Sequence, residues 1–179
     1  MKLTQPHFLG LAFAALVFAI DQLVKWLVTG PLDLPNVLQI DILPFFRLSW
    51  AENTGVSLGL FTADTDLQRW LLVAVTAAIA IVVLVWMLRE TKRGDILALA
   101  LVLGGACGNI LDRVRFGYVA DYADLHFGTF RPFLIFNIAD AAITIGVLLI
   151  LARSLLSREK PDTTPKSTGD TAPESQTHA

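Results

Sequence analysis

The stretch from Trp70 to Leu88 is the feature that most limits how this chain can fold. Its sequence, WLLVAVTAAIAIVVLVWML, contains no charged residue. A helix needs roughly 20 mostly apolar residues to cross a hydrocarbon core of about 30 Å. This stretch therefore predicts a membrane-spanning helix.

Three further apolar stretches have the same character, at about 8–28, 96–113 and 133–152. The first follows Lys2 and resembles a secretory signal peptide, but it continues through Asp21 and Lys25 without a small-residue cleavage site. With 54% hydrophobic and 17% charged residues, the chain is more apolar than an average soluble domain. We therefore expect an all-α membrane protein with four transmembrane helices.

Lysine and arginine in short loops predict the orientation of these helices, because basic loops stay in the cytoplasm. The densest basic cluster is RETKRG, which holds Arg89, Lys92 and Arg93 between the second and third helices. Both ends of the chain are then expected in the cytoplasm. The loops at 29–69 and about 112–132 would face the opposite, outer side.

Two segments outside the helices have distinct compositions. In the loop 29–69, VLQIDI and PFFRLSW alternate in polarity beside prolines, which predicts short strands and a small extramembrane β element. The segment 157–179 is rich in Pro, Thr, Ser and charge, which predicts a disordered cytoplasmic tail. Residues 1–156 would then form one transmembrane domain.

Several functions are excluded by composition. The formal net charge is −2 and the basic residues are dispersed, so nothing indicates nucleic-acid binding. The single cysteine, Cys107, cannot form an internal disulfide, and the histidines His7, His126 and His178 are scattered. We therefore expect neither a bound metal nor another cofactor.

Ionisable residues within the apolar stretches point to function, since each costs about 2.5–3.5 kcal/mol at mid-helix. Asp21 and Lys25 are four residues apart and share one helix face. An ion pair near the outer interface explains them at least as well as direct chemistry. We assign them to the architecture of the site.

The last apolar stretch contains FNIADAAIT, in which Asn137, Asp140 and Thr144 would form one polar stripe. If this helix begins near Phe133, Asp140 lies roughly 10 Å below the outer end and needs a partner or a proton. An interhelical hydrogen bond is the structural alternative, and for Asn137 the two explanations are nearly equal.

The third stretch combines small and polar residues. Gly104 and Gly108 form a small-xxx-small pair, which favours close helix packing. A second polar stripe consists of Gly105, Asn109, Asp112 and Arg113. The last two could cap the helix, or the arginine could hold a substrate carbonyl or a lipid head group.

Asp121 and Asp124 follow in what the sequence predicts to be an outer loop. Either could meet Asp140, because the third and fourth helices end on the same side. Two close carboxyl groups share a proton and supply an acid and a base, as in aspartic proteases. A proton- or solute-coupled transporter is the main alternative, with an assembly subunit behind it, but transport acids would lie near the bilayer centre.

Five blocks of sequence resemble bacterial lipoprotein signal peptidases, also called signal peptidase II, in the order and spacing of that family. They are DQLVK at 21–25, AENTGVSLGLF at 51–61, GGACGNILDR at 104–113, GYVADY at 117–122 and FNIAD at 136–140. Two departures concern packing or loop shape: Tyr122 replaces the usual phenylalanine, and NTGVSLG replaces a run of smaller residues.

The resemblance implies that Asp121 and Asp140 are the catalytic pair, which favours Asp121 over Asp124. Residues that it implies shape the site or bind substrate are Asn53, Gly105, Asn109, Arg113, Asn137 and Ala139. Supporting residues would be Asp21, Lys25, Gly55 and Asp112.

The resemblance also implies a substrate and a location. The substrate would be a prolipoprotein whose cysteine carries a diacylglyceryl group, and cleavage would occur just before that cysteine. The protein would be a multi-pass monomer among the phospholipids of the bacterial inner membrane. Its active site and β element would face the periplasm.

Overall fold

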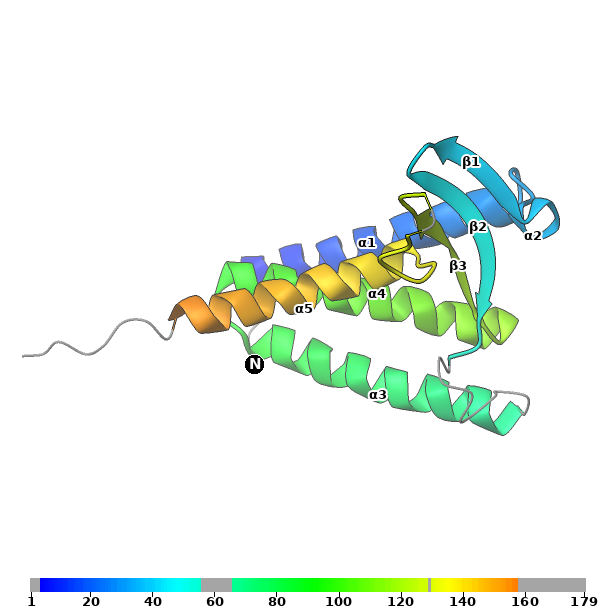
Figure 1. The fold of residues 1–179 in the computed structure, drawn as a ribbon. Coiled ribbons are helices and arrows are strands. Elements are labelled where there is room, and N and C mark those ends of the chain that lie inside the picture. Colours follow the sequence, from blue (N-terminus) through cyan, green and yellow to red (C-terminus); the bar gives the residue numbers. More distant parts are fainter. Residues whose placement is uncertain (1–3, 56–65, 129, 158–179) are drawn as a thin grey trace, which may run out of the picture.

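Four long helices dominate the computed structural model, which describes residues 4–55, 66–128 and 130–157 (Figure 1). They are α1 (Gln5–Thr29), α3 (Asp66–Arg89), α4 (Arg93–Phe116) and α5 (Ile138–Ser157). Each is long and apolar enough to cross a membrane, which confirms the predicted fold class. The predicted tail, apart from Ser157, lies outside the described residues.

Helix α4 is the centre of the bundle, since α1, α3 and α5 all pack against it. Half of its apolar window is buried within the protein, compared with 11% of the window in α3. Lipid therefore surrounds most of α3, whereas α4 can carry polar side chains toward its neighbours. Gly117 ends α4 with φ of 89°, and its N–H donates to the carbonyl of Arg113.

A small antiparallel sheet covers one end of the bundle (Figure 1). Its strands are β1 (Gln39–Leu43), β2 (Phe46–Asn53) and β3 (Val119–Leu125), in that order, and the short helix α2 (Leu34–Val37) leads into it. The first two strands confirm the predicted β element. The third lies where the sequence predicted a loop.

Strand β3 corrects that prediction for a reason that lies outside its own sequence. It pairs with β2, with Ala51 opposite Asp121, and its other edge bonds to Phe136 through the backbone of Ala123. All of its residues except Leu125 are buried. Hydrogen bonds to partners on both edges pair the backbone groups of β3, so the strand forms although its sequence has little β propensity.

The start of the last helix also differs from the prediction. The sequence predicted a span from Phe133, but α5 begins at Ile138. Phe136 is committed to the bridge with β3, and Asn137 accepts a hydrogen bond from the backbone N–H of Asp140 at 2.9 Å. An asparagine in that position caps a helix and fixes where it starts.

Candidate active site

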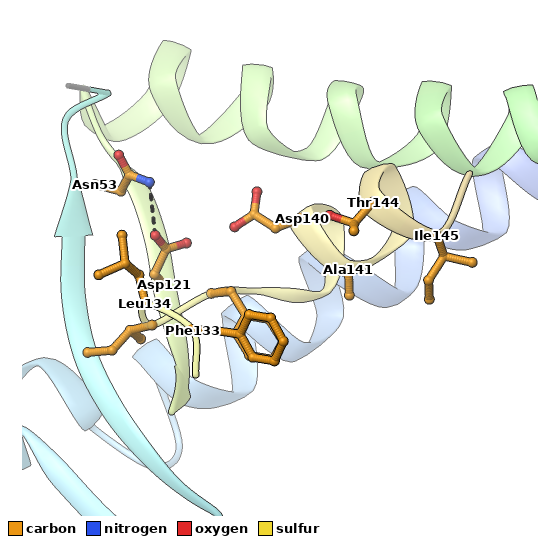
Figure 2. Close-up of a pocket in the computed structure, with 10 residues that line it drawn as sticks. Asn53, Asp121, Phe133, Leu134, Asp140, Ala141, Thr144 and Ile145 are labelled. Atoms are coloured by element: carbon orange, nitrogen blue, oxygen red, sulfur yellow. Dashed lines mark hydrogen bonds between the residues drawn. The ribbon is translucent and has the colours of Figure 1, made fainter. Parts of the chain in front are cut away.

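Asp121 and Asp140 line the same pocket, which has a volume of about 550 Å³ (Figure 2). One residue belongs to β3 and the other to the first turn of α5, and their carboxyl groups point toward each other. The bridge between β3 and Phe136 turns the chain so that residues 19 apart can face one another. The two carboxyl groups that the sequence singled out are thus brought together. We call this cavity the membrane-side pocket.

Asp121 receives amide donors on both carboxyl oxygens. Asn137 donates its Nδ2 to Oδ1 at 2.5 Å, and Asn53 donates its Nδ2 to Oδ2 at 3.0 Å. The residue is only 3% exposed. Burial and the nearby charge of Asp140 raise the pKa of the Asp121 carboxyl to about 6, although the amide donors oppose that rise.

Asp140 is also held through both oxygens. Its Oδ1 accepts from Nδ2 of Asn109 at 2.8 Å, and its Oδ2 accepts from the backbone N–H of Asn137 at 3.4 Å. With the bond from Asp140 N to Asn137 Oδ1, this makes a reciprocal capping arrangement. Asn137 therefore contacts both carboxyl groups and lies ahead of the helix instead of on its polar stripe.

The depth of Asp140 differs from the prediction as a consequence. The residue is the third of α5, within its first turn, and not seven residues below the helix end. Thr144, one turn further along, also lines the pocket. The candidate acid–base pair therefore lies at the end of the bundle that carries the sheet.

A second polar cluster surrounds Lys25. Its Nζ lies 2.9 Å from Asp21 and 2.7 Å from Asp112, and all three side chains are nearly fully buried. The pair between Asp21 and Lys25 is as predicted. Asp112, for which helix capping was one interpretation, is a full member of the cluster. So is Gln22, which the sequence analysis missed; its Nε2 donates to Asp21 at 3.2 Å and Asp112 at 3.0 Å.

The cluster of Lys25, Asp21, Asp112 and Gln22, which we call the Lys25 cluster, positions residues that contact or carry Asp140. Lys25 donates to Oδ1 of Asn109 at 3.2 Å, so the Nδ2 of this amide is the end presented to Asp140. Asp21 accepts the backbone N–H of Ala139 at 3.0 Å and so fixes the first turn of α5. The cluster is connected to the site but does not line its pocket.

Glycines allow this close arrangement of helices. A Cβ on Gly105 would press on the carbonyl oxygen of Ala139 and lie 2.9 Å from Ile143, while one on Gly108 would press on the carboxylate of Asp21. Gly104 approaches α1 in the same way near Ala14, as the small-xxx-small pattern predicted.

Gly55 and Arg113 have different relations to the site. Gly55, at φ of 100°, donates its N–H to Oδ1 of Asn53 at 2.9 Å, which leaves Nδ2 of that amide for Asp121. Arg113 donates weakly to the carbonyl of Asn109 at 3.4 Å, and its buried Nε has no partner in the described part of the chain. It does not line the membrane-side pocket.

Asp124 points away from the candidate pair. It receives Arg47 Nε at 2.8 Å and Ser49 Oγ at 3.1 Å, and Arg131 lies 3.5 Å away. Burial alone would raise the pKa of this carboxyl, but the Arg47 and Ser49 hydrogen bonds and the arginine charges outweigh it and lower the pKa. Across the three described ranges, no group of three or more His, Cys, Asp or Glu residues could hold a metal ion.

Solved structures place this architecture in a class. Two structures, both described as a bacterial membrane enzyme, match with TM-scores of 0.72 and 0.70 at 26% identity. The matches cover 88% and 84% of this chain and 94% of each solved chain. The fold is therefore that of a multi-pass bacterial membrane enzyme.

Sequence comparisons identify the family. Residues 13–156 match the family described as Signal peptidase (SPase) II. A lipoprotein signal peptidase of Sphingopyxis alaskensis is 62% identical over 84% of this chain and 87% of its own, and one of Rhizorhabdus wittichii is 55% identical over 84% and 88%. The chain belongs to the signal peptidase II family. It is accordingly a peptidase of the bacterial inner membrane, which confirms the predicted enzyme class and excludes the transporter alternative.

Proposed function

We propose that this peptidase removes signal peptides from prolipoproteins, with Asp121 and Asp140 as its catalytic pair. The observation that carries the proposal is that these two carboxyl groups face one pocket, each held by amides on both oxygens. The names of the relatives support the substrate class. Cleavage just before a diacylglyceryl-modified cysteine is the finer prediction that we retain.

The reaction that we propose is hydrolysis of one peptide bond by water. Asp140, ionised, takes a proton from the water as its oxygen attacks the scissile carbonyl. Asp121, protonated, donates a hydrogen bond to that carbonyl and then its proton, so that a neutral diol forms. The proton on Asp140 passes to the leaving nitrogen as the C–N bond breaks, and the proton of one diol hydroxyl returns to Asp121.

We assign the shared proton of the catalytic pair to Asp121. Its pKa is raised to about 6 by burial and by the charge of Asp140, as expected for one of two close acids. Asp140 belongs to the first turn of α5, where the helix dipole favours an ionised carboxylate. The three asparagines keep both carboxyl groups in position before substrate arrives.

The orientation that we propose puts both ends of the chain in the cytoplasm and the site toward the periplasm. Arg89 ends α3 and Arg93 begins α4, on the side expected to stay in the cytoplasm. The sheet lies at the other end of the bundle (Figure 1), and the candidate pair comes from its strand β3 and from the first turn of α5. Both acids come from one chain, which supports action as a monomer surrounded by phospholipid.

The direct test replaces each acid without changing its shape. Asp121→Asn and Asp140→Asn should each reduce processing of a lipidated precursor by at least about 10³-fold, because an amide can neither take nor give the proton. Asp124→Asn is the matched control and should retain most activity, since Asp124 lies outside the pocket that holds the candidate pair. Substantial processing by either of the first two variants, inserted normally in membranes, would refute the catalytic assignment.

Lipid dependence requires a separate measurement. Purified protein would be given the same precursor with and without the diacylglyceryl group, and release of the signal peptide would be followed. We expect cleavage of the lipidated form only. Equal cleavage of both forms would agree with a signal peptidase but would refute the proposed dependence on the lipid.

A further inference from the structure

A second cavity meets the membrane-side pocket at Asp121, one member of the candidate pair. It has a volume of about 490 Å³, and we call it the sheet-side pocket. It shares Asn53, Asp121 and the segment 133–135 with the membrane-side pocket. Its other lining residues are Ala51, Glu52, Arg131 and Pro132. A chain that passes from one cavity into the other must therefore cross in front of Asp121.

The two cavities lead in different directions. The membrane-side pocket follows α5 from Asp140 to Ile145, along a helix that can span a membrane (Figure 2). The sheet-side pocket is bounded by β2 and by the segment that precedes α5. A substrate anchored by an apolar signal peptide would thus enter the first pocket from the bilayer and leave through the second.

The cavities also differ in charge. Among the residues that the structure describes, the membrane-side pocket has no charged lining residue apart from the candidate pair, whereas the sheet-side pocket has Glu52 on one wall and Arg131 on the other. Glu52 is exposed and forms no ion pair with the described residues. Arg131 is half exposed and lies 3.5 Å from Asp124, whose closer partner is Arg47 at 2.8 Å. Both charges are therefore available to a bound peptide.

We infer that the sheet-side pocket binds the residues that follow the cleaved bond, and that Arg131 and Glu52 select among them by charge. Arg131 favours acidic side chains there and Glu52 favours basic ones. The inference rests on the proposed function, because it needs a substrate whose signal peptide lies in the membrane. Uncharged walls on one side of the pair and charged walls on the other fit a substrate that is apolar before the bond and polar after it.

The test uses three lipidated precursors that differ only in the two residues after the cysteine, which are Asp-Asp, Asn-Asn or Lys-Lys. The acidic and basic precursors compete in one reaction at low salt, so that product amounts give the ratio of their kcat/KM values. Arg131→Gln should lower the acidic-to-basic ratio about two- to five-fold, the range expected for solvent-exposed charge pairs. Glu52→Gln should raise it by a similar factor.

Three controls separate this subsite from general electrostatics. Arg115→Gln removes an exposed charge near the outer end of α4 that lines neither pocket, and it should leave the ratio unchanged. Moving the charged pairs about ten residues downstream should abolish the response. Salt at about 1 M should also abolish it, since the Debye length falls to roughly 3 Å.

The possible outcomes distinguish this inference from the proposed function. Unchanged ratios in both variants, or a response of Arg115→Gln as large as theirs, would overturn the subsite while cleavage of the Asn-Asn precursor kept the proposed function. Failure of the unaltered protein to cleave any of the three precursors would overturn both.

Discussion

Two carboxylate pairs lie near each other in this protein and differ in the groups that contact them. Asp21 and Asp112 have the ammonium group of Lys25 between them, at 2.9 and 2.7 Å. Asp121 and Asp140 receive hydrogen bonds from asparagines, and neither forms an ion pair with a described lysine or arginine. The single positive charge of Lys25 offsets one of the two negative charges of the first pair, whereas the second pair has no such cation and relieves its repulsion by keeping a proton.

The same contrast appears along a single strand. Asp121 and Asp124 are three residues apart on β3, so they point to opposite sides of the sheet. Arginines surround the second and its pKa is lowered, whereas burial and Asp140 raise the pKa of the first. A fixed ion pair supports architecture, and a carboxyl group with a raised pKa is available for proton transfer.

Removing the cation should have the largest effect on stability. Lys25→Met leaves Asp21 and Asp112 buried without an ammonium group, which should destabilise the fold by about 3–5 kcal/mol. Unfolding of the protein in detergent by heat or by denaturant would measure the loss of stability. The double variant Lys25→Met with Asp112→Asn is the control and should recover part of it. A loss below about 1 kcal/mol would show that the cluster is not a structural ion pair.

The pH dependence of stability should separate the two aspartates of β3. Asp121 has its pKa raised from 3.8 to about 6, so the folded protein keeps a proton that the unfolded chain has lost between these pH values. Its contribution is fully present below pH 3.8 and is lost as pH rises to about 6, a change of about 3 kcal/mol. Asp121→Asn should therefore gain stability over the unaltered protein as pH rises from about 4 to 6.

Asp124→Asn is the matched control and should show the opposite slope. Because the pKa of Asp124 is lowered, its contribution is present above the ordinary value and is lost as pH falls through the folded value. The stability that Asp124→Asn loses relative to the unaltered protein should be smallest at low pH. Parallel slopes of melting temperature against pH for the two variants would contradict the opposite pKa shifts of Asp121 and Asp124.

Much of the fold could be predicted because it depends on local composition. The apolar stretches and the loop with Arg89 and Arg93 predicted four spans, and the four-residue spacing of Asp21 and Lys25 predicted their pair. The blocks around Asp121 and Asp140 predicted the family, which sequence comparison confirms. Such signals act within one helical turn, one span or one short motif.

The rest depends on contacts between distant segments. Strand β3 exists because β2 and Phe136 pair with its edges, and α5 starts at Ile138 because Phe136 is held in that bridge. Gln22 follows Asp21 within an apolar span, which was a usable signal, but its bond to Asp112 on another helix was not visible. Partners far along the chain decided each of these points, through backbone bonds for β3 and α5 and through a side-chain bond for Gln22.

The smallest effects should come from glycines that bring the helices together. Gly105→Ala would push a methyl group against Ala139 in the first turn of α5, and Gly108→Ala would push one against Asp21. Each should destabilise the protein by about 1–3 kcal/mol, as overpacking usually does. Stability alone would not distinguish the two positions.

Activity should distinguish Gly105→Ala from Gly108→Ala, because the first acts on the turn that carries Asp140 and the second on Asp21. Gly105→Ala displaces the turn that carries Asp140, so kcat should fall by more than the loss of folded protein explains, and a displacement of about 1 Å can cost about 10²-fold. Gly108→Ala presses mainly on Asp21, which reaches that turn only through the N–H of Ala139, so its activity should follow the folded fraction more closely. Gly104→Ala, which meets α1 at Ala14, is the packing control. Equal activity per folded molecule in all three variants would mean that the position of α5 does not limit the reaction.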